Sequence, residues 1–559
     1  MAEEEAKQRE VEVVKSGELL FCGGTNWDAM GRKKDATSSA NLVSPTRLRP
    51  LLGVNICFVA SGCASCHCVA LDVHGRCYTW GRNEKGQLGH GDLIQRDRPT
   101  VVSELSKYKI IKAGAGRNHT VVVTEHGDSF SFGWNKHGQL GSGSTKNEIE
   151  TSPVRCLASQ VTNAVCGADF TVWLSSIQGS TILTAGLPQY GQLGHGTDNE
   201  YNLKDASVRL AYEPQPRPRA IASLAQKTIV KVACGTNHTV AVDSNGCVYT
   251  FVQLLGNSCV DIDLLKMFVV SDIHVALPDL SWVRWGFGGY GRLGHREPKD
   301  EWIPRLVETF QRQNVLPPNA VVSAGAANSA CTAGGGQLYM WGKLKVTGDE
   351  WMYPKPLMDL SGWNIRCMDS GNLHHFCGAD ESCISWGNAQ SGELGYGPMG
   401  QKSSANPKKV DILEGMHVID VACGMGHSLI VVDRENVADR LDQLEIYDGE
   451  TPSEAEAETI ASKELSTKKT AKKALASTAG KSKKREKAKD DSDAEDEESN
   501  DGASDDENGS VDGKAKKSRR GNTSSRGRGR TPSKASVEKK SSGRSQGHGR
   551  SAKRGRARK

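Results

Sequence analysis

Residues 67–92 read HCVALDVHGRCYTWGRNEKGQLGHGD, and the same internal order returns along the chain. Residues 119–144 read HTVVVTEHGDSFSFGWNKHGQLGSGS, and further copies begin at residues 170, 285, 329 and 374. Each copy has the pattern of a strand, a turn centred on glycine and a second strand that ends in an aromatic–Gly pair. The motif G-x-L-G follows the second strand in most copies. This self-similarity decides the fold, because a fixed period of about 50 residues indicates a repeat architecture.

The glycine that ends the second strand marks seven repeats, at Gly23, Gly81, Gly133, Gly186, Gly286, Gly342 and Gly387. Neighbouring marks are 45 to 58 residues apart, except for a step of 100 between Gly186 and Gly286. A four-stranded unit of this length is a propeller blade, since one such sheet cannot bury both faces until it stacks on its neighbours. We therefore expect an all-β fold, a seven-bladed β-propeller, over residues 16–445.

The two ends of this region complete each other. HSLIVVD at 427–433 has the first strand of a hairpin without its aromatic–Gly end, and SGELLFCGGTNWDAMG at 16–31 has only the second half. Joined, they read like one repeat. We predict one blade closed by both chain ends, which pairs edges that would otherwise stay open, preceded by an acidic lead at residues 1–15.

We assign structural roles to the positions that recur from repeat to repeat. A slot at the start of each hairpin holds His67, His119, Phe170, His238, Asn328, His374 or His427, and we expect its side chain to begin the inner strand and to bond a neighbouring turn. Trp80 is expected to pack in the core. The structural positions are Trp80, Gly81, Gly86, Gly89, Gly138, Gly141, Gly191, Gly194, Gly291, Gly294, Gly392, Gly395, His119, His238 and His427.

Cys63, Cys66 and His67 have the C-x-x-C-H spacing of a c-type haem site. His67 falls in the slot that all seven repeats share, so haem ligation does not explain it. We find no paired carboxylates, nucleophile with its base, phosphate loop or zinc spacing. The sequence predicts no cofactor and no covalent catalysis.

The hairpin, the aromatic–Gly pair and G-x-L-G at Gly86, Gly138, Gly191, Gly291 and Gly392 resemble the regulator-of-chromosome-condensation family. The resemblance covers roughly residues 16–435. It implies a propeller that binds proteins, and it leaves open an activity as a guanine-nucleotide exchange factor for a transport, Rho or Ras type of small GTPase. No exchange residue can be matched by position.

Residues 251–284 interrupt the fourth repeat. HTVAVDSNGCVYT ends at Thr250, and the expected aromatic–Gly follows only at Trp285. Removing the 34 residues between them restores a normal repeat, NGCVYTWGFGGYGRLGH. Since an insertion normally enters a loop and not a strand, we interpret this segment as a retained intron translated in frame, with a hydrophobic loop as the alternative.

Residues 446–559 form a predicted disordered tail with a Lys-rich zone, an acidic zone and a final Arg- and Lys-rich zone. Residues 451–559 carry a formal charge of +11 and the preceding 450 residues −6. From Lys514 onward there are 18 Lys and Arg against one carboxylate, which favours nucleic-acid binding. The proposed import and nucleic-acid residues are Lys481, Lys483, Lys484, Arg485, Lys514, Lys516, Lys517, Arg519, Arg520, Arg526, Arg528 and Arg530.

Ser492 and Ser504, each followed by acidic residues, are candidate phosphorylation sites. Neither a signal segment nor an apolar run long enough to span a membrane occurs, so we expect a soluble protein without a membrane partner. The sequence predicts a nuclear scaffold, on chromatin, in the nucleolus or on the spindle. Its expected partners are chromatin or nucleic acid, and small GTPases and microtubules remain open.

Overall fold

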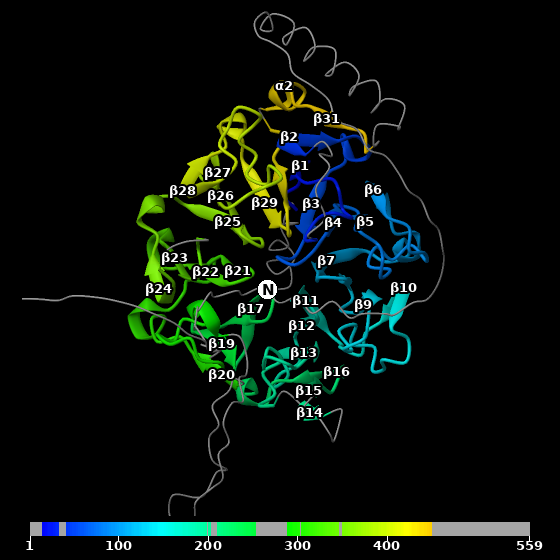
Figure 1. Ribbon diagram of the computed structural model, residues 1–559, viewed down its shortest axis with the longest axis vertical. Helices are drawn as coiled ribbons and strands as arrows, with labels where there is room; N and C mark the ends of the chain where they lie inside the picture. The colour runs from blue at the N-terminus through cyan, green and yellow to red at the C-terminus, as the bar shows by residue number, and fades with distance from the viewer. Residues whose placement is uncertain are drawn as a thin grey trace, which may run out of the picture. The chain divides into compact units, whose positions relative to one another are not determined.

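The computed structural model describes residues 14–32, 41–197, 200–202, 210–252, 288–301, 303–345, 349–435 and 437–449. Seven sheets form a ring, and the first strand of each sheet lies nearest the centre (Figure 1). The predicted all-β, seven-bladed propeller is confirmed. No described helix is long and apolar enough to cross a membrane.

The blades are numbered from the first complete sheet. Blade 1 contains β3 (Ile56–Ala60), β4 (His67–Asp72), β5 (Cys77–Gly81) and β6 (Arg96–Val101). Blade 2 contains β7 (Ile110–Ala115), β8 (His119–Thr124), β9 (Ser129–Trp134) and β10 (Ile149–Arg155). Blade 3 contains β11 (Val161–Cys166), β12 (Phe170–Ser175), β13 (Ile182–Gly186) and β16 (Gln215–Ala220), with a separate hairpin of β14 (Glu200–Asn202) and β15 (Leu210–Tyr212).

Blade 4 contains β17 (Ile229–Cys234), β18 (Thr239–Asp243), β19 (Val248–Val252) and β20 (Ile303–Leu306). Blade 5 contains β21 (Val322–Ala324), β22 (Asn328–Thr332), β23 (Leu338–Gly342) and β24 (Trp351–Pro356). Blade 6 contains β25 (Ile365–Ser370), β26 (His374–Ala379), β27 (Ser382–Gly387) and β28 (Ser404–Lys409). Blade 7 contains β29 (Val418–Cys423), β30 (His427–Val432), β1 (Glu18–Gly23), β2 (Leu42–Leu48) and β31 (Ile446–Tyr447). One short helix, α2 (Ala438–Leu441), precedes β31.

The position after the core aromatic residue requires glycine, because the backbone of the neighbouring strand lies too close for a side chain. Gly81 has φ of 113°, and a Cβ there would lie 2.6 Å from the Cα of His67. The pairing of β5 with β6 shifts register between Thr79 and Gly81, which is a β-bulge at this glycine. The bulge turns the chain out of the strand, so that the G-x-L-G segment can fold back over the blade.

Both chain ends form blade 7, as the sequence predicted. The strand β1 pairs with β30 on one side and β2 on the other. Glu18 is buried at the start of β1 and accepts hydrogen bonds from Arg434, at 2.7 Å, and Arg47, at 3.2 Å. The sequence did not indicate the fifth strand, β31, which runs parallel to β2. These contacts join the first and last described segments into one sheet.

Blade 4 shows where extra residues enter the repeat. In four blades a hydroxyl of the third strand donates to the carbonyl of the G-x-L-G leucine nine positions later, as Thr79 Oγ1 does to Leu88 at 2.8 Å. In blade 4 the same bond joins Thr250 Oγ1 and the Leu293 carbonyl at 2.8 Å, across 43 positions. The repeat therefore resumes its geometry after 34 additional residues, the length of the predicted insertion.

The strand β19 continues for two residues into that segment. Phe251 pairs with Pro304 and Val252 with Ile303, without the bulge seen at Gly81. Residues 253–287 lie outside the described part of the chain. We propose that residues 251–284 derive from a retained intron, because the bond from Thr250 to Leu293, which flank the segment, matches the bond of the uninterrupted blades.

Deleting residues 251–284 tests this proposal. Trp285 and Gly286 would then follow Thr250 and supply the aromatic–Gly pair, so we expect a folded propeller with a Tm equal to or above that of the full chain. Circular dichroism melting measures it. A deletion of equal length at residues 246–279 removes all of β19 and should abolish cooperative unfolding. An unfolded product from the first deletion would contradict the proposal.

Candidate functional site

Five of the seven slot positions hold buried histidines that connect neighbouring blades. The histidine Nε2 atom approaches a hydroxyl on the second strand of the next blade in four of them: His67 to Thr120 at 2.7 Å, His119 to Thr171 at 2.9 Å, His238 to Ser329 at 2.9 Å and His374 to Ser428 at 2.9 Å. His427 lies 3.1 Å from Ser61 Oγ and 3.2 Å from Cys68 Sγ of blade 1. The predicted slot partner was therefore wrong in part: the histidine lies at the start of the second strand, not the innermost, and contacts a strand hydroxyl instead of a turn.

The hydroxyl partner determines which ring nitrogen carries the proton. Thr120 Oγ1 donates its proton to the Gln87 carbonyl of blade 1 at 2.8 Å. It must therefore accept the bond from His67, so His67 is protonated at Nε2. His119 and Thr171, with the Gln139 carbonyl at 2.7 Å, repeat this arrangement. Each relay joins a histidine, a hydroxyl and a G-x-L-G carbonyl.

Burial keeps these histidines neutral. It lowers the pKa of His67, His119, His238 and His427 to about 3, and that of His374 to about 4. A protonated ring would lose its hydration and place a charge between two sheets. The relays are therefore structural contacts that hold blades together, and they do not provide a proton for catalysis.

The other slots break the pattern. Phe170 fills the slot of blade 3 and is fully buried. Asn328 fills that of blade 5, and the residue after the slot in blade 6 is His375, whose Nδ1 lies 3.0 Å from Ser370 of its own blade. The contact from blade 5 to blade 6 therefore lacks the histidine–hydroxyl pair.

The haem-like spacing does not gather its three side chains. Cys63 Sγ lies 3.5 Å from Thr236 Oγ1, Cys66 Sγ donates to the Met30 carbonyl at 3.7 Å, and His67 Nε2 contacts Thr120. Among the described residues, no cluster of three or more His, Cys, Asp or Glu side chains is placed to hold a metal ion.

The predicted structural positions lie where the repeat places them. Trp80 is buried, and all ten glycines of the five G-x-L-G motifs have positive φ. The predicted tail residues, Lys481 to Arg530, and the two candidate phosphorylation sites lie outside the described residues.

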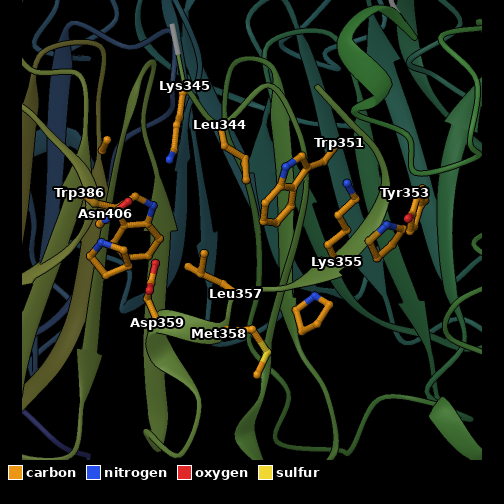
Figure 2. A pocket seen from close by; sticks show the side chains of 14 residues that line it. Leu344, Lys345, Trp351, Tyr353, Lys355, Leu357, Met358, Asp359, Trp386 and Asn406 are labelled. Carbon is orange, nitrogen blue, oxygen red and sulfur yellow. The ribbon is translucent and has the colours of Figure 1, made fainter. Parts of the chain in front are cut away.

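A cavity of about 510 Å³ opens between β24 of blade 5 and β28 of blade 6. We call it the blade 5–6 groove and define it by Lys345, Trp351, Tyr353, Lys355, Met358 and Trp386. Figure 2 shows Trp386 and Asn406 on one side and Trp351 on the other, with Leu344 and Leu357 between them. Met358 is 68% exposed and Tyr353 38%. An exposed aromatic and apolar concavity is typical of a binding site.

Sequence reasoning missed this groove. Trp351 and Tyr353 stood outside the motifs, and Trp386, at an aromatic–Gly position, is buried at 3% exposure although it also lines the cavity. The signal was present in the segment after Gly342, which reads KLKVTGDE and contains no G-x-L-G.

Comparison with known proteins agrees with the repeat. The sequence model of the regulator of chromosome condensation (RCC1) repeat matches residues 74–123, 126–174, 181–242, 284–332 and 380–431. Protein RCC2 homolog of Xenopus laevis is 36% identical over 448 residues, which cover 76% of this chain and 79% of the relative. Human protein RCC2 is 35% identical over 461 residues, which cover 78% and 80%. The chain belongs to the RCC1 repeat family.

Within this family the chain is similar to RCC2, as its opening GELLFCGGTNWDAMGR and long charged tail had indicated. The crystal structure of Prp20p from Saccharomyces cerevisiae has a TM-score of 0.54 at 18% identity, covering 77% of this chain and 96% of that chain. It was described together with the binding properties of Prp20p to Gsp1p and histones. The likeness shows a shared fold, the propeller of RCC1 repeats.

Because the buried histidines are neutral in the folded chain, we predict that the stability of the propeller falls in acid. Below pH 6.5 the unfolded chain takes up protons that the folded His119, with a pKa of about 3, does not, so stability falls as the pH falls. The loss is about 2 kcal/mol for each such histidine at pH 5. Replacing His119 by Phe, the residue that the chain uses at position 170, should remove this share of the loss between pH 7 and pH 5, as measured by urea unfolding.

The control is His126→Phe, because the His126 side chain is 80% exposed. Asp369 and Asp420 face the central channel, and burial raises the pKa of Asp369 to about 7 and that of Asp420 to about 6. Because the folded state binds protons at these two carboxyl groups more readily, they raise the stability as the pH falls, opposite to the histidines. Both groups are present in every variant, so their effect cancels in the comparison. If His119→Phe and the unmodified chain lose stability in parallel, His119 is not the neutral buried group described above.

Proposed function

We propose that this chain is a nuclear scaffold, associated with chromatin or the spindle, whose propeller binds proteins while its tail binds nucleic acid. The observation that carries the proposal is the division of charge, +11 over residues 451–559 against −6 over the preceding 450. The cationic end of such a tail neutralises phosphates and releases counterions without reading base sequence. The propeller remains available to proteins.

Several features support this assignment. Lys481, Lys483, Lys484 and Arg485, and the cluster from Lys514 to Arg520, fit the pattern of nuclear import signals. Prp20p, which shares the fold, is described with histones and Gsp1p as partners. We assign this chain a nuclear location, with chromosomes, nucleolus and spindle as places where its tail would find acidic polymers, microtubules included. A membrane is not among its proposed partners.

The acidic zone between the two cationic zones supplies a means of regulation. Ser492 and Ser504 each precede carboxylates, and phosphate groups there would add negative charge beside the cationic ends. Phosphorylation should therefore weaken nucleic-acid binding through competition within the tail.

Salt dependence tests the role of the tail in the full-length chain. We expect the slope of log K against log salt, measured by anisotropy with a labelled DNA duplex, to become shallower by about 2.7 when Arg526, Arg528 and Arg530 are replaced by Gln, because each phosphate contact contributes about 0.9. Gln at Lys107, Lys146 and Lys402, exposed on the propeller, removes the same charge and should leave the slope unchanged. Equal slopes for the two variants would reject the proposal.

The alternative function is guanine-nucleotide exchange on a small GTPase, which the family resemblance implies. Release of a fluorescent guanine nucleotide from transport, Rho and Ras types of GTPase distinguishes it. A hundredfold acceleration of one member by the full chain, about 2.7 kcal/mol of barrier, would establish exchange. Unchanged release from every member in the presence of a folded chain would leave the scaffold function.

A further inference from the structure

The blade 5–6 groove exists because one repeat lacks the turn that covers its neighbour. In blade 1, Gly81 pairs with Arg96 and 14 residues lie between them. In blade 6, Gly387 pairs with Ser404 across 16 residues, whereas in blade 5, Gly342 pairs with Trp351 across only eight. The shorter connection has no room for G-x-L-G, and it belongs to the segment 333–379 that the RCC1 repeat model leaves out.

The missing turn removes the glycine that would pack on an aromatic residue of the next blade. Gly89 of blade 1 packs so closely on Phe132 of blade 2 that a Cβ would lie 2.8 Å from its ring, and Gly294 covers Trp341 in the same way at 3.1 Å. Trp386 is the corresponding residue of blade 6. It is only 3% exposed, because Leu344, Trp351 and Leu357 pack against its cluster, and it forms part of the groove wall. The same junction also lacks the histidine–hydroxyl contact, so both devices that join blades are absent where the cavity opens.

The strands that border the groove disfavour pairing with another strand. β24 and β28 are the outermost strands of their sheets, and such edges normally offer free N–H groups. Pro354 and Pro356 on β24 and Pro407 on β28 have no N–H to donate. A partner must therefore be held mainly through its side chains, inserted into the groove.

The groove combines apolar depth with a cationic rim. Lys355 Nζ lies 5.3 Å from the ring centroid of Trp351 and 5.2 Å from that of Tyr353. Lys345 lines the same cavity, and Asp359 is the single carboxylate in the lining. Arg296, 5.0 Å from the Tyr353 ring, is already paired with Glu308. A neutral partner would leave this charge unused, while a cationic partner would be repelled by it.

We propose that the blade 5–6 groove binds a short, extended, acidic segment of a partner protein that inserts one large apolar side chain beside Trp351, where the buried Trp386 forms part of the wall. The carboxylates of the segment pair with Lys345 and Lys355 at the rim. A cavity of about 510 Å³ accommodates one such anchor with its neighbours. This inference rests on the proposed role of the propeller as a protein-binding scaffold, and it specifies the chemistry of the partner.

The test uses the full chain and a fluorescein-labelled heptapeptide, Asp-Asp-Glu-Phe-Leu-Asp-Glu, with anisotropy as the readout. We expect saturable binding that weakens at least tenfold in Lys355→Glu and in Met358→Asp, both at partly or largely exposed positions. Lys107→Glu is the matched control, because Lys107 also lies over a tyrosine, 5.1 Å from the ring of Tyr108, but in another blade. It should change the affinity by less than twofold.

Two further peptides identify what the groove recognises. Replacing Phe-Leu by Ala-Ala in the peptide should abolish binding if the anchor is required, and replacing the acidic residues by Lys should abolish it if charge is required. Absence of binding by the acidic peptide, equal binding to Lys355→Glu, or preference for a neutral proline-rich peptide would overturn the proposal. The DNA measurement does not involve the groove, so failure here leaves the proposed function of the tail standing.

Discussion

The pairing of β1 with β30 is the constraint on which the other contacts depend. A four-stranded blade exposes two apolar faces, and each face is buried only when a blade lies on either side of it. The first and last strands of the propeller must therefore meet in one sheet. Glu18, buried between Arg47 and Arg434, adds charged contacts at that place. Ring closure gives every blade a neighbour on both faces. The apolar faces are then buried, and the contacts within each repeat become stable.

Within the ring, two devices repeat at the junctions between blades. The glycines of G-x-L-G bring its turn onto an aromatic or apolar side chain of the next blade, and a slot histidine reaches a hydroxyl there. The glycine device is an apolar contact between a turn and a side chain, and the histidine device is a buried hydrogen bond from Nε2, so both hold neighbouring sheets together. The junction between blades 5 and 6 lacks both, and the groove is the geometric result. A local loss of repeat character thus produces a distinctive surface on an otherwise regular ring.

The bond from Thr250 to Leu293 shows how strongly the repeat controls the local geometry. It has the same length, 2.8 Å, as the bond from Thr79 to Leu88, although 34 more residues separate its partners. The cost of closing a longer loop grows only slowly with its length. A blade can therefore keep its core contacts around an added segment, and the identity of the segment is a separate question from the stability of the fold.

The sequence by itself determined the number of blades, the closure by both ends and the place of Trp80 and the glycines, because these follow from periodic spacing and from backbone conformations that only glycine adopts readily. The tertiary structure decided the rest. His67 bonds Thr120, 53 positions away, and Trp386 and Trp351 line one cavity from two neighbouring blades. Such contacts depend on how neighbouring sheets stack, and no spacing within one repeat encodes them. The short segment after Gly342 was visible in the sequence, but only the neighbouring blade shows that the missing G-x-L-G turn leaves a groove beside Trp386.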